Sequence, residues 1–303
     1  MIRYTGFTKR FGKVAAVSGL DLEVREGEAL ALIGPNGSGK TTTLKAALGL
    51  IRPTAGSVTV DGLDAVAAGR QARARLGYLP QRLSFPEGCA AREVMRFYAR
   101  LRGADAREVD ALLDRVDLLA AADRTAEEFS GGMKQRLGIA VALLGTPGAL
   151  VLDEPTAALD PTGSLSVRDL VARIRAEGTT VLLSSHDLAE VSALASRLAV
   201  FVAGKLVALG TPGELVRELG LHARIQVGIA DWLPDPREAA ERAGARQVEW
   251  VGTTLRCEVL PGREAAVVEA LRQAGTQLTE ITVRTPDLED IYRAVTLSGR
   301  RAA

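Results

Sequence analysis

The 303-residue chain has only two cysteines, two histidines and 4% aromatic residues, and its net charge is close to zero. Cys89 and Cys257 lie far apart in the sequence, so we interpret them as ordinary reduced thiols rather than as a disulfide framework. Lys and Arg total 38 against 37 Asp and Glu. Charge therefore gives no case for nucleic acid or an anionic membrane surface as the main ligand.

Long apolar runs are also missing. Apolar residues make up 47% of the chain, yet no uncharged run approaches the roughly 18 to 20 residues that span a bilayer. The nearest candidate, Leu198 to Leu209, is interrupted by Lys205. Charged residues such as Arg3 and Lys9 replace the apolar start of a signal peptide. We therefore expect a cytoplasmic protein.

The stretch GPNGSGKT, from Gly34 to Thr41, fits the pattern G-x-x-x-x-G-K-[ST]. An apolar strand pattern precedes it and a helical pattern follows, and this context argues against a chance glycine-rich turn. In such a loop the backbone N–H groups wrap a phosphate chain, with the helix N-terminus behind them. Lys40 would reach the β- and γ-phosphates, and the Thr41 hydroxyl would bind Mg²⁺. The residues expected around the phosphates are Gly34, Pro35, Asn36, Gly37, Ser38, Gly39, Lys40, Thr41 and Thr42.

Polar side chains follow three further strand patterns. In Leu150 to Glu154, Asp153 would hold Mg²⁺ through water, and Glu154 would orient or deprotonate the attacking water. Without the phosphate loop, the same acids would equally fit a solvated strand end. Gln81 could accept from a metal-bound water, although most glutamines are surface residues. His186 ends a parallel strand, at the edge where open α/β sheets bind ligands, which favours a γ-phosphate contact.

Two more features leave alternatives open. Ser130-Gly131-Gly132 opens a helix, so it is either a capped helix start or a second anion-binding helix N-terminus. Phe11 lies in KRFGK, where its ring would stack on adenine or would simply be a core or surface aromatic.

The periodicities predict an α/β fold with two domains. Residues 1–220 combine a parallel-sheet core, an antiparallel sheet beside it and a helical subdomain at about 85–145. Residues 221–303 follow the order βαββαβ plus a helix, a split-βαβ or ferredoxin-like layout. This accessory domain would bind a regulator or partner, steady a dimer or dock to another subunit. We expect it to be dispensable for ATP binding, because every phosphate-contacting motif lies at or before His186.

The ordered set of motifs resembles the nucleotide-binding subunit of ATP-binding-cassette (ABC) transporters over about residues 1–218. The set comprises GPNGSGKT, Gln81, SGGM at 130–133, LVLDE at 150–154, ALD at 158–160 and His186. The resemblance implies a P-loop ATPase that binds ATP and Mg²⁺, with Thr41, Gln81 and Asp153 at the metal. It also implies that Ser130, Gly131 and Gly132 contact ATP held by a second copy, and that Asp160 signals across this dimer. The usual Leu and Gln beside Ser-Gly-Gly are here Phe129 and Met133, so side-chain contacts from position 133 differ.

Partners and location follow from the same resemblance, which is to exporter-type systems with a separate membrane subunit. It implies a homodimer on the cytoplasmic face of the inner membrane, driving a multispanning subunit. RLGYLP, RFYARLRG, AAADR and PDLEDIYR look more narrowly like the ATPase subunit of the transporter for copper-site maturation in nitrous oxide reductase. That likeness adds a periplasmic accessory protein as a partner, although we expect this chain itself not to bind copper, because it lacks clustered soft ligands.

Three alternatives remain. The first is an exporter for another cargo, such as a drug, lipid or polysaccharide. The second is an ABC ATPase acting on DNA or ribosomes, although this chain has one cassette and no sustained heptads. The third is a nucleotide-gated module without turnover, which the presence of Glu154 and His186 disfavours.

Overall fold

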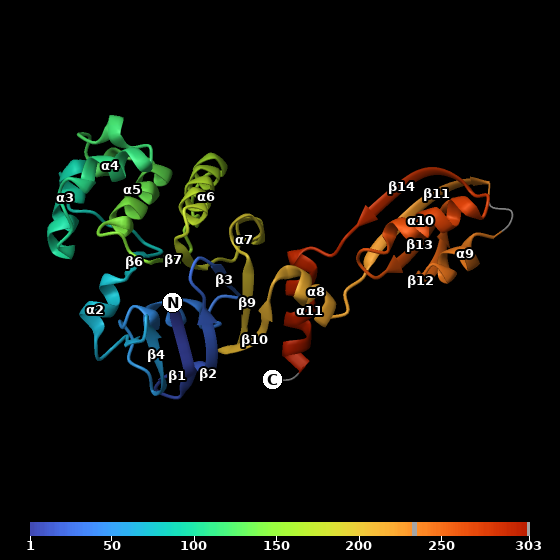
Figure 1. Ribbon diagram of the computed structural model, residues 1–303, viewed down its shortest axis with the longest axis horizontal. Helices are drawn as coiled ribbons and strands as arrows, with labels where there is room; N and C mark the ends of the chain where they lie inside the picture. The colour runs from blue at the N-terminus through green and yellow to red at the C-terminus, as the bar shows by residue number, and fades with distance from the viewer. Residues whose placement is uncertain (232–234, 302–303) are drawn as a thin grey trace. The chain divides into compact units, whose positions relative to one another are not determined.

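The computed structural model describes residues 1–231 and 235–301 and divides the chain into two compact units, Met1–Thr211 and Pro212–Ala303. Figure 1 shows the elements of each unit. The domain boundary expected after Gly220 falls later in the chain than this division. The expected C-terminal domain also includes residues 232–234 and 302–303, which lie outside the described residues.

A six-stranded sheet forms the centre of the first unit. Its order is β10-β9-β3-β8-β7-β6, and all neighbours are parallel except β10 and β9. The strands are β3 (Ala29–Ile33), β6 (Leu76–Leu79), β7 (Ala149–Asp153), β8 (Thr180–Ser184), β9 (Arg197–Val202) and β10 (Lys205–Gly210). Every residue of β3, β7 and β8 is buried, as expected for parallel strands covered on both faces.

A second, four-stranded antiparallel sheet lies beside it in the order β2-β1-β4-β5. Its strands are β1 (Ile2–Phe11), β2 (Val14–Val24), β4 (Ala55–Val60) and β5 (Leu63–Asp64). Side chains from both sheets and from α1 (Lys40–Ala47) share one apolar core, which includes Phe7, Leu32 and Leu44. The sequence prediction of an antiparallel sheet next to a parallel core is confirmed.

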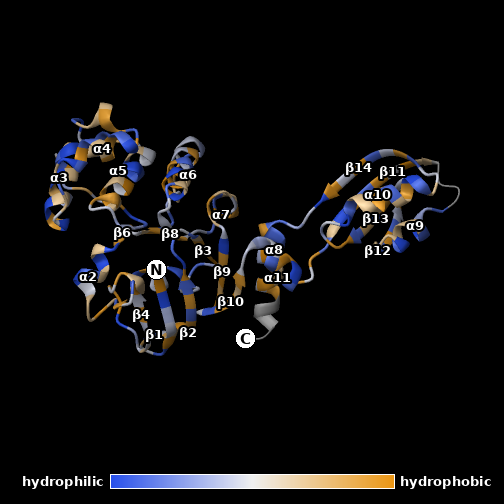
Figure 2. Cartoon of the chain, viewed as in Figure 1, coloured by the Kyte–Doolittle hydropathy of each residue, from blue (hydrophilic) through white to orange (hydrophobic). Residues whose placement is uncertain are grey.

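The helical subdomain consists of α3 (Ala91–Arg102), α4 (Glu108–Arg115) and α5 (Gly131–Leu143), joined by two short 3-10 turns. Helix α3 begins where the Glu93 carboxylate accepts a hydrogen bond from the Ala90 N–H at 2.9 Å. Val94 and Met95 are fully buried, whereas Leu101 on the same helix is 67% exposed. Figure 2 shows both apolar and polar residues along these helices.

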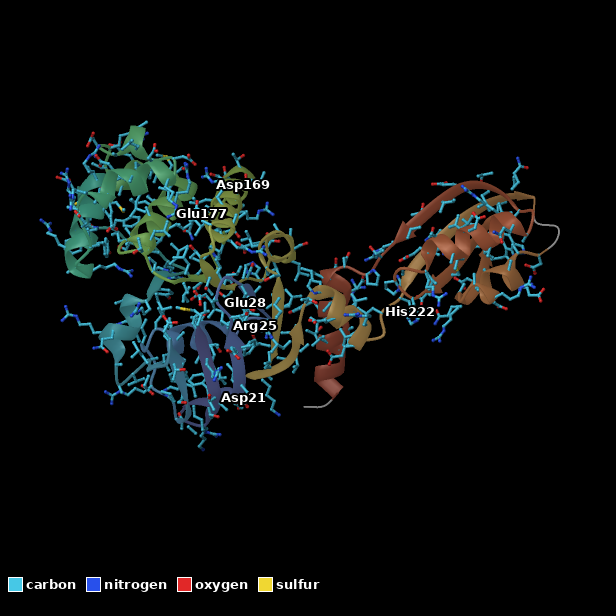
Figure 3. All side chains as sticks on the ribbon, viewed as in Figure 1. Asp21, Arg25, Glu28, Asp169, Glu177 and His222 are labelled. Atoms are coloured by element: carbon cyan, nitrogen blue, oxygen red, sulfur yellow. The ribbon has the colours of Figure 1, made fainter. Side chains whose placement is uncertain are left out.

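Three further helices connect strands of the first unit: α2 (Gly69–Ala74), α6 (Pro161–Ala176) and α7 (Leu188–Leu194). A largely buried ion pair joins the entry of β3 to the entry of β9. Arg197 donates to both carboxylate oxygens of Glu28 at 3.1 Å, and Figure 3 labels Glu28 among the strands of the first unit. The pair ties two neighbouring strands that are far apart in the sequence.

The second unit begins with α8 (Pro212–Glu218), which packs against the last helix, α11 (Leu288–Arg301). Between them run β11 (Ala223–Asp231), α9 (Arg237–Arg242), β12 (Arg246–Val251), β13 (Thr254–Val259), α10 (Glu264–Gln273) and β14 (Gln277–Arg284). The strands form an antiparallel sheet in the order β12-β13-β11-β14. This is the split-βαβ arrangement predicted from the sequence.

Within the described ranges, no helix combines the length and the apolar composition needed to cross a bilayer.

Candidate functional site

The loop between β3 and α1 depends on glycine at two positions of close backbone approach. A Cβ atom on Gly34 would lie 2.3 Å from the Phe201 carbonyl oxygen. Gly39 has φ 105°, and a Cβ there would lie 2.5 Å from the Ala16 carbonyl oxygen. Side chains at these positions would push the loop away from β2 and β9. The loop is therefore held in one tight conformation, in the strand-to-helix context that the sequence predicted.

Lys40 is 6% exposed and folds back onto this loop. Its ammonium donates to the Gly34 carbonyl at 2.7 Å and to the Pro35 carbonyl at 3.3 Å. Burial lowers the pKa of the Lys40 side chain, while the nearby carboxylates of Glu154 and Asp153 act in the opposite direction. A buried cation thus lies between the loop and the two acids that follow β7.

Ser38 is 2% exposed, and its hydroxyl oxygen has no hydrogen-bond partner among the described residues. A buried hydroxyl without a partner is uncommon in folded proteins. Its position inside the loop fits a group that binds a ligand's oxygen.

Asp153 and Thr41 come together as the metal-site hypothesis requires. The Thr41 hydroxyl donates to the Asp153 carboxylate at 3.1 Å, and the Ser184 hydroxyl donates to the same oxygen at 2.7 Å. Asp153 is 1% exposed and lies opposite Ser184 in the parallel ladder of β7 and β8. These contacts fix the carboxylate at the carboxyl edge of the sheet, beside the phosphate loop.

Glu154 has a left-handed backbone, with φ 55°, and its N–H donates to the Ser184 carbonyl at 3.1 Å. This conformation is uncommon for a non-glycine residue and turns the chain sharply at the strand end. The side chain is buried, and its carboxylate contacts the Nδ1 atom of His186. The imidazole itself is largely exposed. The structure therefore brings together Glu154, predicted to act on the attacking water, and His186, predicted to contact the γ-phosphate.

A second group of predicted site residues gathers at the N-termini of α5 and α6. Ser130 caps α5 by accepting the Met133 N–H at 3.3 Å, and Asp160 caps α6 by accepting the Gly163 N–H at 2.8 Å. A Cβ on Gly132 would lie 3.1 Å from the Gly163 Cα, so the two helix starts are close neighbours. Ser130 and Gly131 are exposed. Both readings of the Ser-Gly-Gly segment remain open, since a capped helix start also presents free N–H groups.

Two predicted residues are not joined to either group. Phe11 is 53% exposed at the end of β1, with the Lys9 ammonium 5.0 Å from its ring centroid. Gln81 is exposed beyond the end of β6 and has no hydrogen bond to another described residue. Its role at the metal stays a prediction, as does the link between nucleotide and membrane subunit that the family resemblance implies for it.

Sequence reasoning missed Ser184 and Glu190 as residues that support the site. Ser184 was predicted only as a strand residue, yet it holds both Asp153 and Glu154. Glu190 on α7 is 1% exposed, and burial raises its pKa, with Asp187 and Glu154 adding to the shift and the hydroxyls of Ser185 and Thr156 opposing it. The sequence places Asp153 and Ser184 each at the end of a buried strand pattern, but the pairing of these two strands is known only from the structure. Nothing in the pattern around Glu190 marked it as buried.

The fold and the site together define a P-loop nucleoside triphosphatase. The phosphate loop follows a central parallel strand, and an acid pair lies at the carboxyl end of a strand in the same sheet.

Comparisons with known proteins place the chain more narrowly. Residues 17–157 match the family model described as "ABC transporter". The chain is 37% identical to the daunorubicin resistance ATP-binding protein DrrA3 of Streptomyces coeruleorubidus, over 99% of this chain and 97% of that protein. It is 35% identical to the Nod factor export ATP-binding protein I of Rhizobium etli, over 99% and 93%.

Solved structures agree with this placement. An ATP-binding subunit of an ABC transporter superposes with a TM-score of 0.67 and 28% identity, covering 73% of this chain and 94% of that one. The cassette MJ0796, in a dimeric post-hydrolysis state bound to ADP and phosphate, gives 0.63 and 25%, covering 70% and 98%.

The chain belongs to the family of ABC transporter ATP-binding proteins. It is an ATPase, converting ATP and water into ADP and phosphate.

Proposed function

We propose that this chain is the energy-coupling subunit of an exporter, working as an ATP-dependent homodimer on a separate membrane subunit. The observation that carries the proposal is the carboxyl edge of β7, where Asp153 and Glu154 are fixed beside Lys40 and Thr41. The full-length similarity to drug-resistance and Nod factor export ATP-binding proteins supports the coupling role.

The residues at this edge fit Mg²⁺. The Thr41 hydroxyl and the Asp153 carboxylate lie 3.1 Å apart, and both are the hard oxygen donors that this ion prefers. The ion, when bound with ATP, would neutralise charge on the phosphate oxygens. We assign Thr41 as a direct ligand and Asp153 as a ligand through water.

Within the site, Lys40 would exchange its two carbonyl contacts for phosphate oxygens, and the buried Ser38 hydroxyl would gain the partner that it lacks among the described residues. Glu154 would accept a proton from the attacking water. His186, now in contact with Glu154, is exposed enough to turn toward a γ-phosphate. When the His186 ring turns away, the Glu154 carboxylate would be free to accept a hydrogen bond from the attacking water.

The cluster at the starts of α5 and α6 supports a dimer. Ser130 and Asp160 cap the N-termini of α5 and α6, and Gly132 lies close to Gly163 where these two helices begin. Helix N-termini attract anions. We propose that they contact ATP held by a second copy. A solved cassette of this fold is described as dimeric.

The surface between α2, α3 and β6 is the best candidate for docking a cytoplasmic segment of the membrane subunit. A cavity of about 430 Å³ opens there, with the exposed Leu50 and Leu101 at its rim. Arg70, Arg73 and Arg102 also line it. The combination fits a short amphipathic helix that carries an acidic residue.

For the cargo, the relatives' names, which refer to daunorubicin resistance and to Nod factor export, favour an exporter of a drug or of a Nod-factor-like molecule. The names of these relatives do not mention copper or nitrous oxide reductase, so the copper role and its periplasmic accessory protein stay predictions. A peripheral position on the cytoplasmic face of the membrane follows from the proposed coupling role.

Copurification tests the coupling role. The tagged chain, expressed in its native host and extracted in mild detergent, should retain a multispanning membrane protein in stoichiometric amount. Recovery with nucleic acid or ribosomal proteins instead would favour the non-transport alternative. Recovery of the chain alone under conditions that preserve other transporter complexes would remove the support for coupling.

A further inference from the structure

The second unit presents a regular free strand edge. Strand β14 is the outer strand of its sheet, and it pairs with β11 and with no other strand that the structure describes. From Glu280 to Arg284 its ladder with β11 is uninterrupted. Strand β14 has two register shifts against β11, but both lie before this stretch, between Gln277 and Glu280. In the opposite edge strand, β12, a register shift between Arg246 and Glu249 and φ 50° at Gln247 leave a shorter uninterrupted ladder, Glu249–Val251. Bulges of this kind disfavour pairing with another chain, so β14 is the edge open to it.

The two faces of β14 differ in character. Ile281 lies opposite Val227 and Val283 opposite Ile225, and both of these β11 residues are fully buried. Paired residues in an antiparallel ladder point to the same face. Ile281 and Val283 therefore belong to the apolar face, yet they are 38% and 44% exposed. Glu280, Thr282 and Arg284 alternate with them on the polar face.

We propose that β14 pairs antiparallel with β14 of a second copy of this chain, around a two-fold axis at Thr282. This register sets Ile281 opposite Val283 of the second copy on the apolar face. It sets Glu280 opposite Arg284 of the second copy on the polar face. Because the axis repeats each contact, the edge gains two apolar pairs and two opposite-charge pairs.

Other registers lose this complementarity. An axis at Ile281 would place Glu280 opposite Thr282 and leave Arg284 opposite Leu278. An axis at Val283 would move Glu280 opposite Pro286, which has no N–H to donate. An axis between two residues would set apolar side chains against polar ones, because a shift by one residue exchanges the faces of a strand. Complementarity therefore selects Thr282 as the axis and a second copy as the occupant.

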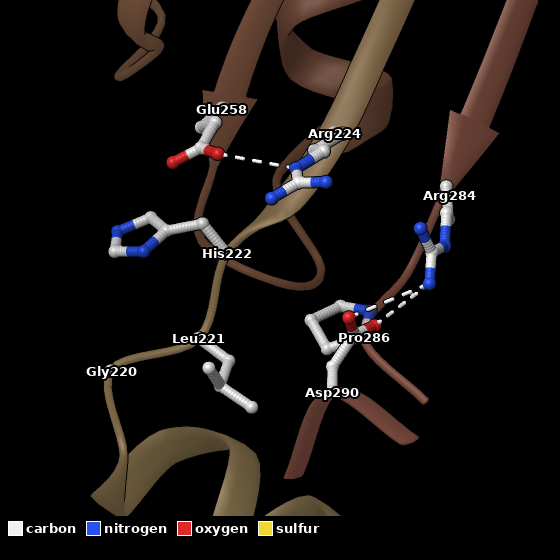
Figure 4. A pocket seen from close by; sticks show the side chains of 8 residues that line it. All are labelled: Gly220, Leu221, His222, Arg224, Glu258, Arg284, Pro286 and Asp290. Carbon is white, nitrogen blue, oxygen red and sulfur yellow. Dashed lines mark hydrogen bonds and ion pairs between the residues drawn. The ribbon is translucent and has the colours of Figure 1, made fainter. Parts of the chain in front are cut away.

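The charges are available for such a pairing. Glu280 is exposed and has no ion pair within the described residues. Arg284 contacts Asp290 at 3.3 Å and Asp287 at 3.5 Å, but its side chain remains 53% exposed. Figure 4 shows the contact between Arg284 and Asp290, and beside it the Arg224–Glu258 pair that joins β11 and β13. A guanidinium carries five N–H donors, so Arg284 can keep its contact with Asp290 and reach Glu280 of a second copy.

The contact is separate from the proposed ATP-dependent dimer and adds a nucleotide-independent link between copies. A pairing of one short strand with its equivalent is a small interface, so we expect it to be weak in the isolated chain and detectable by covalent trapping.

Cysteine cross-linking tests the register directly. In the full chain with Cys89→Ser, Thr282→Cys places two thiols at the axis, where paired Cα atoms lie about 4.5 to 5.5 Å apart, within disulfide range. The remaining native cysteine, Cys257, is 3% exposed, and burial raises its pKa to about 11, so it stays an unreactive thiol. Glu280→Cys is the matched control. Its two copies would be offset by four residues, roughly 13 Å, which is beyond disulfide reach.

We expect mild oxidation without nucleotide to cross-link the Thr282→Cys chain at least tenfold faster than the Glu280→Cys chain. Adding Glu280→Arg to Thr282→Cys should slow cross-linking about tenfold, because position 280 of each copy would then place an arginine opposite Arg284 of the other copy. Adding Arg284→Glu as well should restore the rate. Equal rates for the two cysteine positions, or no rescue by the charge exchange, would overturn the inference. The ATP-dependent dimer, measured on the same samples, reports on the proposed function independently.

Discussion

Glu154 is the residue that we propose as the general base of the site. It is buried, held in a left-handed conformation by Ser184 and placed against His186. Its neighbour Asp153 faces Thr41. One strand end therefore directs two adjacent acids to different partners, which suits the separate metal and water roles that we propose for them.

Glu154→Gln should keep ATP binding, lose about 10²- to 10⁴-fold of turnover, and accumulate a nucleotide-bound dimer. The amide preserves shape but cannot accept the proton of water, and general-base catalysis contributes roughly this factor. Phosphate-release kinetics and size-exclusion chromatography with and without ATP measure both effects. A variant that stays monomeric with ATP and turns over at the wild-type rate would remove Glu154 from the catalytic role.

Glu190→Gln should change the pH dependence of stability. Burial raises the pKa of Glu190 above its usual value near 4.5, so the folded state keeps a proton that the unfolded state releases. Wild-type stability from this residue is therefore full below about pH 4.5 and declines as pH rises toward the raised pKa. The amide of the variant does not ionise, so this loss of stability does not occur in it. The free energy of unfolding of the variant should therefore rise relative to that of wild type over the same pH range.

Urea unfolding at a series of pH values measures this difference. Glu87→Gln, at an exposed glutamate, is the control and should follow the wild-type profile. A constant difference between Glu190→Gln and wild type across the series would show that Glu190 is already ionised in the folded protein.

At the scale of elements, the surface between α2, α3 and β6 carries the coupling proposal. Leu101→Glu should weaken retention of the membrane subunit about tenfold or more, because burying a leucine side chain contributes roughly 1.5 to 3 kcal/mol. Leu101 is 67% exposed, so the fold should tolerate the change. The ATPase rate of the isolated chain should stay within twofold of wild type. Leu119→Glu, at another exposed leucine away from this surface, is the matched control. Equal copurification of the two variants would rule the surface out.

The strands and helices were largely predictable because their signals are local. The apolar run Ala29–Ile33 became β3, and the 3.6-residue spacing of Val94 and Leu101 became α3. The phosphate loop was predictable for the same reason, since its pattern is continuous in the sequence. By contrast, the close approach of Gly132 to Gly163 and the hold of Ser184 on Asp153 depend on tertiary packing. A single sequence carries no local pattern for such contacts.

At the scale of the whole molecule, we predict that the two units have separate functions. All the residues assigned to ATP lie in Met1–Thr211. Truncation after Thr211 should therefore keep ATP affinity within about twofold. Truncation after Gly220 retains α8 without its partner α11 and exposes the buried Leu215, so this longer chain should be less soluble. Calorimetric titration with ATP and measurement of the soluble fraction test both. Loss of ATP binding in a soluble, folded truncation after Thr211 would refute the division of labour.

The position of β3 also has a consequence for the order of synthesis. Its two neighbours in the sheet, β8 and β9, begin roughly 150 residues later in the chain. At about 5 to 20 residues per second, a ribosome would need roughly 8 to 30 s to deliver them. Throughout that interval the apolar strand and its phosphate loop emerge without the partners that bury them. The nascent chain therefore needs protection at this apolar strand until the last third of the first unit has been made.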